Sequence, residues 1–206
     1  ALDNASFSIE KGEFVVILGP SGAGKSTLLN LLGGMDSVTS GEIIVDGKNI
    51  ASYNEKQLTK YRAQDVGFVF QFYNLIPTLT AYENIGLVSD ICKNALSPTE
   101  VLEQVGLLDH KLQFPSQLSG GEQQRVSIAR AVSKNPKMLL CDEPTGALDS
   151  ETGVQILTLL QNLSRQHEKT VVIVTHNSAL AEAADKVIRV KNGKIKSVTI
   201  AKNPKA

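Results

Sequence analysis

Short apolar runs alternate along this chain with segments of helical period. Four runs are apolar without interruption and rich in β-branched or aromatic residues: FVVIL (14–18), VGFVF (66–70), MLLCD (138–142) and TVVIVT (170–175). Continuous apolarity is typical of strands buried on both faces, and alternation of such strands with helices is typical of a mostly parallel sheet. The pattern therefore predicts an α/β fold with a parallel core.

Two other segments predict antiparallel hairpins. EIIVDGKNI carries Asp46-Gly47 between β-formers, and KVIRVKNGKIKSV carries Asn192-Gly193 in the same setting. Both pairs favour two-residue turns. We expect these hairpins to flank the parallel core.

The stretch between Pro77 and Pro136 shows no strand pattern. Ser97-Pro98-Thr99-Glu100 is instead a helix start, a capping box with proline at the first helical position. A chain of 206 residues can bury a sizeable core, so we expect one domain over residues 1–206. Its nucleotide-binding core with a β subdomain would cover 1–76 and 134–206, and an inserted helical subdomain would cover 77–133.

Composition narrows the function classes. Lysine plus arginine number 21 and so do aspartate plus glutamate, which leaves a net charge of zero and no overall field for nucleic acid or a membrane surface. Cys92 and Cys141 lack framework spacing, so we expect free thiols in a reducing compartment. No apolar run has membrane-spanning length and no leader pattern opens the sequence, so we expect the chain alone to be soluble.

GPSGAGKST follows the strand FVVIL directly and fits G-x-x-x-x-G-K-[ST]. Its glycines let successive backbone N–H groups turn toward one centre, and the next helix adds the positive end of its dipole. The motif predicts a triphosphate site in which Lys25 neutralises the β- and γ-phosphates and Ser26 ligates Mg²⁺. The predicted nucleotide-binding residues are Gly19, Pro20, Ser21, Gly22, Ala23, Gly24, Lys25, Ser26 and Thr27.

MLLCDEP ends a buried strand in two adjacent carboxylates, at the sheet edge where such folds bind ligands. Neighbouring strand residues point opposite ways, so one carboxylate can reach the metal and the other the attacking water. We assign Asp142 to Mg²⁺ and Glu143 to the water. Acidic pairs are common in turns, so this motif alone is a weak signal. Together with the phosphate loop it indicates a metal and water site.

These two motifs define a nucleotide hydrolase or kinase and no more. LSGGEQQR, residues 118–125, adds a Ser-Gly-Gly helix start, which by itself is most often a simple cap. With the three motifs in this order, the chain resembles the ATP-binding subunits of ABC (ATP-binding cassette) transporters over essentially its whole length. The resemblance implies that ATP bound by one chain is also gripped by a second, head-to-tail copy, through Ser119, Gly120, Gly121 and Glu122.

The same resemblance implies further roles. Gln71, after VGFVF, would reach the metal and the attacking water, and His176, after TVVIVT, would contact the γ-phosphate. Asp149, in ALD, would lie in the loop that crosses the dimer interface, although Gly146 stands where the family commonly has serine. The family's adenine-stacking aromatic residue would precede ALDNASFSIEKGE, and we expect it outside this sequence.

FQFYNLIPTLTAYENI, residues 70–85, combines apolar side chains with Pro77, which predicts a poor buried helix but a suitable lip for a groove. A satellite hydrophobic cluster under a loop is the alternative. This stretch and GGMDSVTSGEIIVDG resemble the branch of lipoprotein-release, macrolide-efflux and antimicrobial-peptide-resistance ATPases, and TGALDSETG leans toward peptide-resistance members of Gram-positive bacteria. The resemblance implies ATP and Mg²⁺ as cofactors, an integral membrane permease docking near 70–85, a peripheral position on the cytoplasmic membrane face and no nucleic acid partner.

Three other functions stay open at this point. A complex of this kind can signal to a membrane protein without moving cargo, and sequence does not separate that role from transport. A soluble ATPase of the same class normally adds coiled coils, zinc modules or basic arms, and none is visible in the sequence. A metabolic phosphoryl-transfer enzyme would need an acceptor-binding segment and would not need LSGGE.

Overall fold

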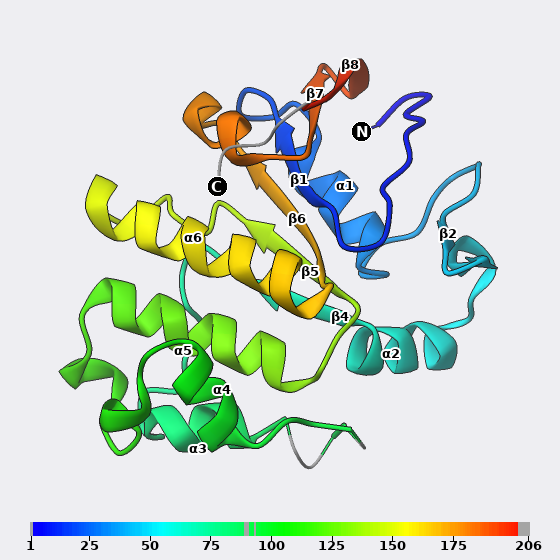
Figure 1. Cartoon of the computed structure of the whole chain (residues 1–206). Coiled ribbons are helices and arrows are strands. Elements are labelled where there is room, and N and C mark those ends of the chain that lie inside the picture. Colours follow the sequence, from blue (N-terminus) through cyan, green and yellow to red (C-terminus); the bar gives the residue numbers. More distant parts are fainter. Residues whose placement is uncertain (1, 89–90, 93, 202–206) are drawn as a thin grey trace.

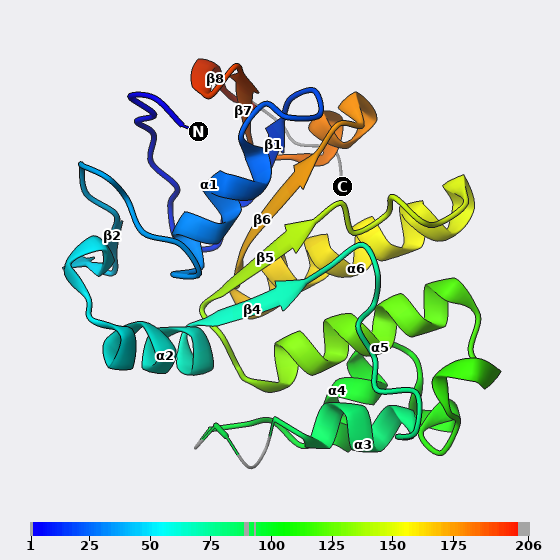
Figure 2. The same cartoon turned by 180° about the vertical axis from the view of Figure 1, so that it is seen from behind.

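The computed structural model describes residues 2–88, 91–92 and 94–201. A six-stranded sheet forms its centre, in the order β4-β5-β6-β1-β7-β8 (Figures 1 and 2). All neighbouring strands pair in parallel except β7 and β8. The predicted α/β class and the four predicted strands are confirmed, with β4 ending one residue early. The bounds are β1 (Phe14–Leu18), β4 (Val66–Val69), β5 (Met138–Asp142), β6 (Thr170–Thr175), β7 (Lys186–Lys191) and β8 (Lys194–Ile200).

Both predicted hairpins are present, at different places. β2 (Ile44–Val45) and β3 (Lys48–Asn49) form a separate two-stranded antiparallel sheet. β7 and β8 extend the edge of the main sheet, and their turn holds Asn192 at φ 52° and Gly193 at φ 75°. Positive φ at both turn positions is what a two-residue hairpin of this kind requires, and it explains the Asn-Gly pair.

Helices cover both faces of the main sheet (Figures 1 and 2). α1 (Lys25–Leu32) packs on one face against β5 and β6, whereas α6 (Ser150–His167) lies on the other. β1 is buried along its whole length and divides its side chains between two cores. Phe14, Val16 and Leu18 join the core under α5 and α6, and Val15 and Ile17 join the core under α1. This two-sided burial is the reason for the uninterrupted apolar run.

A group of helices lies beside β4, at the edge of the sheet (Figure 2). α5 (Gly120–Ser133) packs against α3 (Ala81–Gly86), α4 (Pro98–Gln104) and β4. The described residues between 77 and 136 contain no strand, as predicted, and α4 begins at the expected Ser97 capping box. The remaining helices are α2 (Glu55–Gln64) and 3₁₀ turns at Ile50–Ser52, Leu108–His110, Pro115–Gln117 and Ser178–Ala183.

One expectation about the segment 70–85 is wrong. Its last residues form the start of α3, where Thr80 and Glu83 make a capping box and Ala81 and Ile85 are buried. The Thr-x-x-Glu signal stands in the sequence, and Pro77 precedes the helix and does not interrupt it.

Two compositional expectations can also be compared with the structure. Cys92 and Cys141 are both buried free thiols, as predicted. Within the described part of the chain, none of the helices has the length and apolarity needed to cross a bilayer.

Candidate functional site

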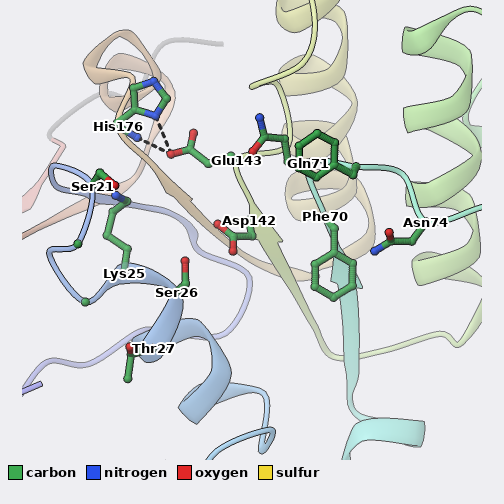
Figure 3. Close-up of a pocket in the computed structure, with 13 residues that line it drawn as sticks. Ser21, Lys25, Ser26, Thr27, Phe70, Gln71, Asn74, Asp142, Glu143 and His176 are labelled. Atoms are coloured by element: carbon green, nitrogen blue, oxygen red, sulfur yellow. Dashed lines mark hydrogen bonds and ion pairs between the residues drawn. The ribbon is translucent and has the colours of Figure 1, made fainter. Parts of the chain in front are cut away.

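A cavity of about 570 Å³ opens at the carboxyl ends of the parallel strands (Figure 3). Four separate segments line it: the loop between β1 and α1, the segment after β4, the end of β5 and the residue after β6. Parallel strands end at one edge of the sheet, so side chains far apart in sequence meet there. The predicted residues that line the cavity are Ser21, Gly22, Gly24, Lys25, Ser26, Thr27, Gln71, Asp142, Glu143 and His176.

Sequence reasoning missed three residues in the lining of this cavity. Phe70, Phe72 and Asn74 lie with Gln71 in the segment after β4. All three lie in the stretch 70–85, which is predicted above to form the lip of a docking groove. No local pattern marks them as part of a nucleotide cavity, because the segment 70–74 contains no helix or strand. Only their place beside the phosphate loop brings them to the site.

The loop before α1 turns its backbone toward the cavity. Gly22 has φ 76° and Gly24 φ 102°, a region that favours glycine. Gly24 is the N-cap of α1 and no side chain caps this helix, so its first N–H groups point to the cavity end without a side-chain acceptor. The buried Lys25 Nζ donates to the carbonyls of Gly19 (2.8 Å) and Pro20 (3.1 Å). This arrangement concentrates positive potential where an anion can approach.

Asp142 is half-buried at the end of β5. Burial raises the pKa of its carboxyl, while a hydrogen bond with Ser26 and the charge of Lys25 lower it and the charge of Glu143 raises it further. Burial is the largest of these causes. The carboxylate and hydroxyl of Asp142 and Ser26 thus meet at one side of the cavity.

Glu143 leaves the strand geometry with φ 46°, in the left-handed region. Its backbone still donates to Val174, but the side chain no longer follows strand alternation, and both carboxylates line the same cavity. The Glu143 carboxylate accepts from Thr175 Oγ1 (2.8 Å) and from the His176 backbone N–H (2.9 Å), and it lies 2.8 Å from His176 Nδ1 (Figure 3). These contacts fix the orientation of the carboxylate.

Gly146 gives the Gln71 side chain its room. A Cβ at position 146 would lie 3.0 Å from Gln71 Nε2 and 3.3 Å from the Glu143 carbonyl. A serine at this position would therefore be in tight contact with the end of the Gln71 side chain. Asp149 lies farther along this segment, where its side chain accepts from the Thr152 N–H and caps α6.

The Ser-Gly-Gly segment lies at the start of α5, as predicted, and outside the lining described above. The Glu122 carboxylate accepts from the Ser119 N–H (2.7 Å) and hydroxyl (2.8 Å), and these bonds lower the pKa of Glu122. Gly121 is also required by packing, because a Cβ there would lie 2.3 Å from Thr152 Cγ2. His110 lies beside this helix start, with its Nε2 3.8 Å from Glu122 Oε1.

Comparison with known proteins gives a consistent result. A sequence model of the family described as ABC transporter matches residues 2–146. An uncharacterized ABC transporter ATP-binding protein of Mycobacterium tuberculosis is 46% identical over 199 residues, which cover 94% of this chain and 80% of the relative. The ABC transporter ATP-binding protein YtrE of Bacillus subtilis is 43% identical, with 95% of this chain and 87% of YtrE covered.

Solved structures agree with these sequence matches. The ATP-binding cassette MJ0796 of Methanocaldococcus jannaschii, in a dimeric post-hydrolysis state bound to ADP and Pi, has a TM-score of 0.87 and 42% identity, covering 98% of this chain and 91% of that one. Fold, cavity and sequence lead to the same assignment, and this chain belongs to the ABC transporter family as an ATP-hydrolysing ATP-binding cassette.

Proposed function

We propose that this chain is the ATPase subunit of a membrane ABC transporter and that two copies close head to tail around two ATP molecules. The observation that carries the proposal is a division of parts within the chain. The cavity gathers Lys25, Asp142 and Glu143, whereas Ser119–Gly121 begin a helix outside its lining. A second copy would bring that helix start to the γ-phosphate, and the dimeric state of MJ0796 supports this arrangement.

The loop Gly19–Thr27 binds the phosphates in this proposal. Its N–H groups and the Lys25 ammonium meet the negative charge, and the uncapped start of α1 adds its dipole. Hydrogen bonds from Lys25 Nζ to the carbonyls of Gly19 and Pro20 hold the ammonium inside the loop, so little reorganisation is needed when phosphates bind.

The residues at one side of the cavity fit a magnesium ion. The Ser26 hydroxyl and the Asp142 carboxylate lie on the same side of the cavity (Figure 3), and the Gln71 side chain lines the same cavity. Hydroxyl, carboxylate and amide oxygens are ligands that Mg²⁺ accepts. We assign these three side chains to the ion, which when bound neutralises charge on the phosphates.

Glu143 orients the attacking water and accepts its proton. The bonds from Thr175 and His176 hold its carboxylate at the cavity wall, which is the positioning that a general base needs. His176 is 70% exposed at its side chain and can turn toward a γ-phosphate. Glu143 and His176 thus complete the hydrolytic site that the phosphate loop begins.

Binding and hydrolysis then drive opening and closure. Each ATP would join one chain's Gly19–Thr27 to the other's Ser119–Gly121, with Asp149 in the loop that crosses between the chains. Loss of the γ-phosphate weakens the interface and shifts the population to the open form. The core, 1–76 and 134–206, and the helical subdomain, 77–133, are the two parts that would move relative to each other.

A membrane permease docks near 70–85 in this proposal. Phe72 is 73% exposed, and Ile76 and Tyr82 are each 40% exposed, so apolar side chains gather on this segment. A permease helix would cover them and hold the chain at the cytoplasmic membrane face. The cargo class that fits the branch is a peptide, lipoprotein or drug taken out of the cell or out of the membrane.

The variant Glu143→Gln tests this function. The amide keeps the shape but accepts no proton, so we expect turnover to fall by about 10²- to 10⁴-fold while ATP still binds. Size-exclusion chromatography with saturating Mg²⁺ and ATP should then show a dimer, and with ADP a monomer. Glu103→Gln, on the exposed side of α4, serves as the control. A variant that stays monomeric with ATP, or that hydrolyses ATP at the normal rate, contradicts the proposal.

A further inference from the structure

A buried glutamine of α5 lies between the two chain segments that carry the proposed hydrolytic residues. Gln124 is completely buried, and its Nε2 donates to the carbonyls of Pro144 (2.8 Å) and Phe70 (3.3 Å). Phe70 directly precedes Gln71, and Pro144 directly follows Glu143. One side-chain amide therefore joins the helix that starts at Ser119 to the backbone beside both residues.

The oxygen of this amide accepts no hydrogen bond from the described residues. Gln124 Oε1 is buried without a hydrogen bond within the described part of the chain. An unpaired buried acceptor is unfavourable, so an apolar side chain of similar length would suit this position if filling space were its only role. What the glutamine adds is its two donors, and both are used on the segments beside Gln71 and Glu143.

α5 is also hydrogen-bonded to the backbone that follows Gln71. The Arg130 guanidinium donates to the carbonyls of Asn74 (2.8 Å) and Tyr73 (3.2 Å), and burial lowers its pKa. The backbone on both sides of Gln71 is thus bonded to side chains of one helix. These bonds form a direct physical connection between α5 and the Gln71 segment.

We propose that Gln124 is a positioning residue that couples the Ser119–Gly121 end of α5 to Gln71 and Glu143. The proposal rests on the head-to-tail dimer described above. There, Ser119–Gly121 serve the partner's ATP while Gln71 and Glu143 serve the chain's own ATP. Gln124 lies five residues from Ser119 on one helix, or about 7.5 Å along its axis, so it links the two ATP sites through a single chain.

The test replaces the amide by a thioether of similar length, Gln124→Met. We expect kcat for ATP to fall about tenfold, because both hydrolytic residues lose their support, while KM for ATP changes less than about twofold, because the phosphate loop is untouched. The control is Gln123→Met. Gln123 is the neighbouring side chain, and its amide donates to the carbonyl of Leu118, just before the start of its own helix. It should keep more than half of the normal kcat.

A second readout separates coupling from stability. Hydrogen exchange is measured by mass spectrometry in the Glu143→Gln background, with ATP and Mg²⁺ added in steps. With Gln124 present, residues 120–130 and 66–76 should gain protection at the same ATP concentrations. In the double variant with Gln124→Met, the two segments should gain protection separately. Joint protection in the double variant overturns the proposal.

The two variants separate a failure of the Gln124 coupling from a failure of the proposed ATPase site. If Glu143→Gln remains active, the proposed site fails. If Glu143→Gln is inactive but Gln124→Met keeps more than half of kcat, even with a lower melting temperature, only the coupling fails. Should Gln124→Met not fold, Gln124→Asn takes its place, because its amide is one methylene too short to reach both carbonyls. Should neither fold, separate protection of the two segments in Glu143→Gln alone overturns the coupling.

Discussion

Two glycine-containing helix starts in this chain look alike in sequence and differ in structure. The loop before α1 presents N–H groups without a side-chain cap, and a cavity opens in front of them. The start of α5 is closed by its own capping box, in which Glu122 occupies both the N–H and the hydroxyl of Ser119. Both are anion sites by geometry, but only the first is free to take a phosphate within one chain.

The two helix starts need different phosphate donors. A phosphate that reaches Ser119 must displace a carboxylate that already holds its two donors, and it must arrive from outside the cavity of the same chain. A triphosphate carried by a second copy meets both conditions. In the proposed dimer, the α1 start would determine ATP affinity and the α5 start would determine assembly.

The largest expected effect comes from breaking the first helix start. Lys25→Ala removes the ammonium held by Gly19 and Pro20, and hydrogen bonds from a charged donor contribute about 1.5–3 kcal/mol each. We expect ATP affinity to fall by about 100-fold or more, measured by equilibrium dialysis. Lys60→Ala, exposed on α2, is the control. Affinity within about threefold of normal would remove the phosphate loop from the site.

Ser119→Asp breaks the second helix start and spares the first. Aspartate is also a favoured N-cap residue, but it cannot donate to Glu122 as the Ser119 hydroxyl does, so we expect the fold to persist with a small drop in melting temperature. The added charge would face the partner's γ-phosphate, so we expect turnover to fall about 100-fold, similar to the loss of one oxyanion donor, with normal ATP binding to the monomer.

Ser97→Asp gives a matched control for this prediction. Ser97 and Glu100 form the same capping box at the start of α4. An aspartate there should leave turnover unchanged. Normal turnover in Ser119→Asp itself would mean that the α5 start is a cap and no more.

Glu122→Gln should give the smallest effect. Hydrogen bonds from Ser119 lower the pKa of Glu122, so the carboxylate is charged at pH 7 and competes with phosphate for the same donors. A neutral glutamine still closes the capping box. In the Glu143→Gln background we expect the ATP-bound dimer to tighten by about threefold, a size typical of helix-end charges, as measured by analytical ultracentrifugation.

The thermal stability of Glu122→Gln should fall, although its dimer tightens. A carboxyl with a lowered pKa stabilises the fold above its ordinary pKa, and this contribution is lost as the pH falls through the folded-state value. Glu122→Gln should therefore melt slightly below the unaltered chain at pH 7, and the difference should shrink as the pH falls below the ordinary range of a carboxyl pKa and through the lowered folded-state value. Glu100→Gln, in the matching box, should leave dimerisation unchanged. A weaker dimer in Glu122→Gln would show that the carboxylate assists assembly.

Local patterns predicted much of the fold because their causes are local. The run FVVIL is apolar throughout because alternate side chains enter two cores, and Asn192-Gly193 stands where both residues have positive φ. The helical character of 77–133 is predicted, but the segment 70–85 is predicted to be a poor buried helix because it contains Pro77, whereas α3 begins at the Thr80 capping box three residues after this proline.

The candidate site likewise contains residues that local motifs predict and residues that only the tertiary structure places there. The order of GPSGAGKST, MLLCDEP and LSGGEQQR indicates the chemistry, because each motif places donors or carboxylates at one strand end or helix start. The sequence does not mark Phe72 or Asn74 as cavity residues, and it does not explain Gly146. Their roles depend on which segment lies opposite.

By itself, the sequence determined the strands, the turns, the helix caps and the nucleotide chemistry, since each depends on residues within a few positions of one another. Only the tertiary structure decided that Glu143 turns out of its strand, that Glu122 occupies the donors of Ser119 and that Gln124 reaches Phe70, 54 residues away, and Pro144, 20 residues away. A hydrogen bond between distant segments requires both to be placed within about 3 Å, and packing of the whole sheet and its helices sets that placement.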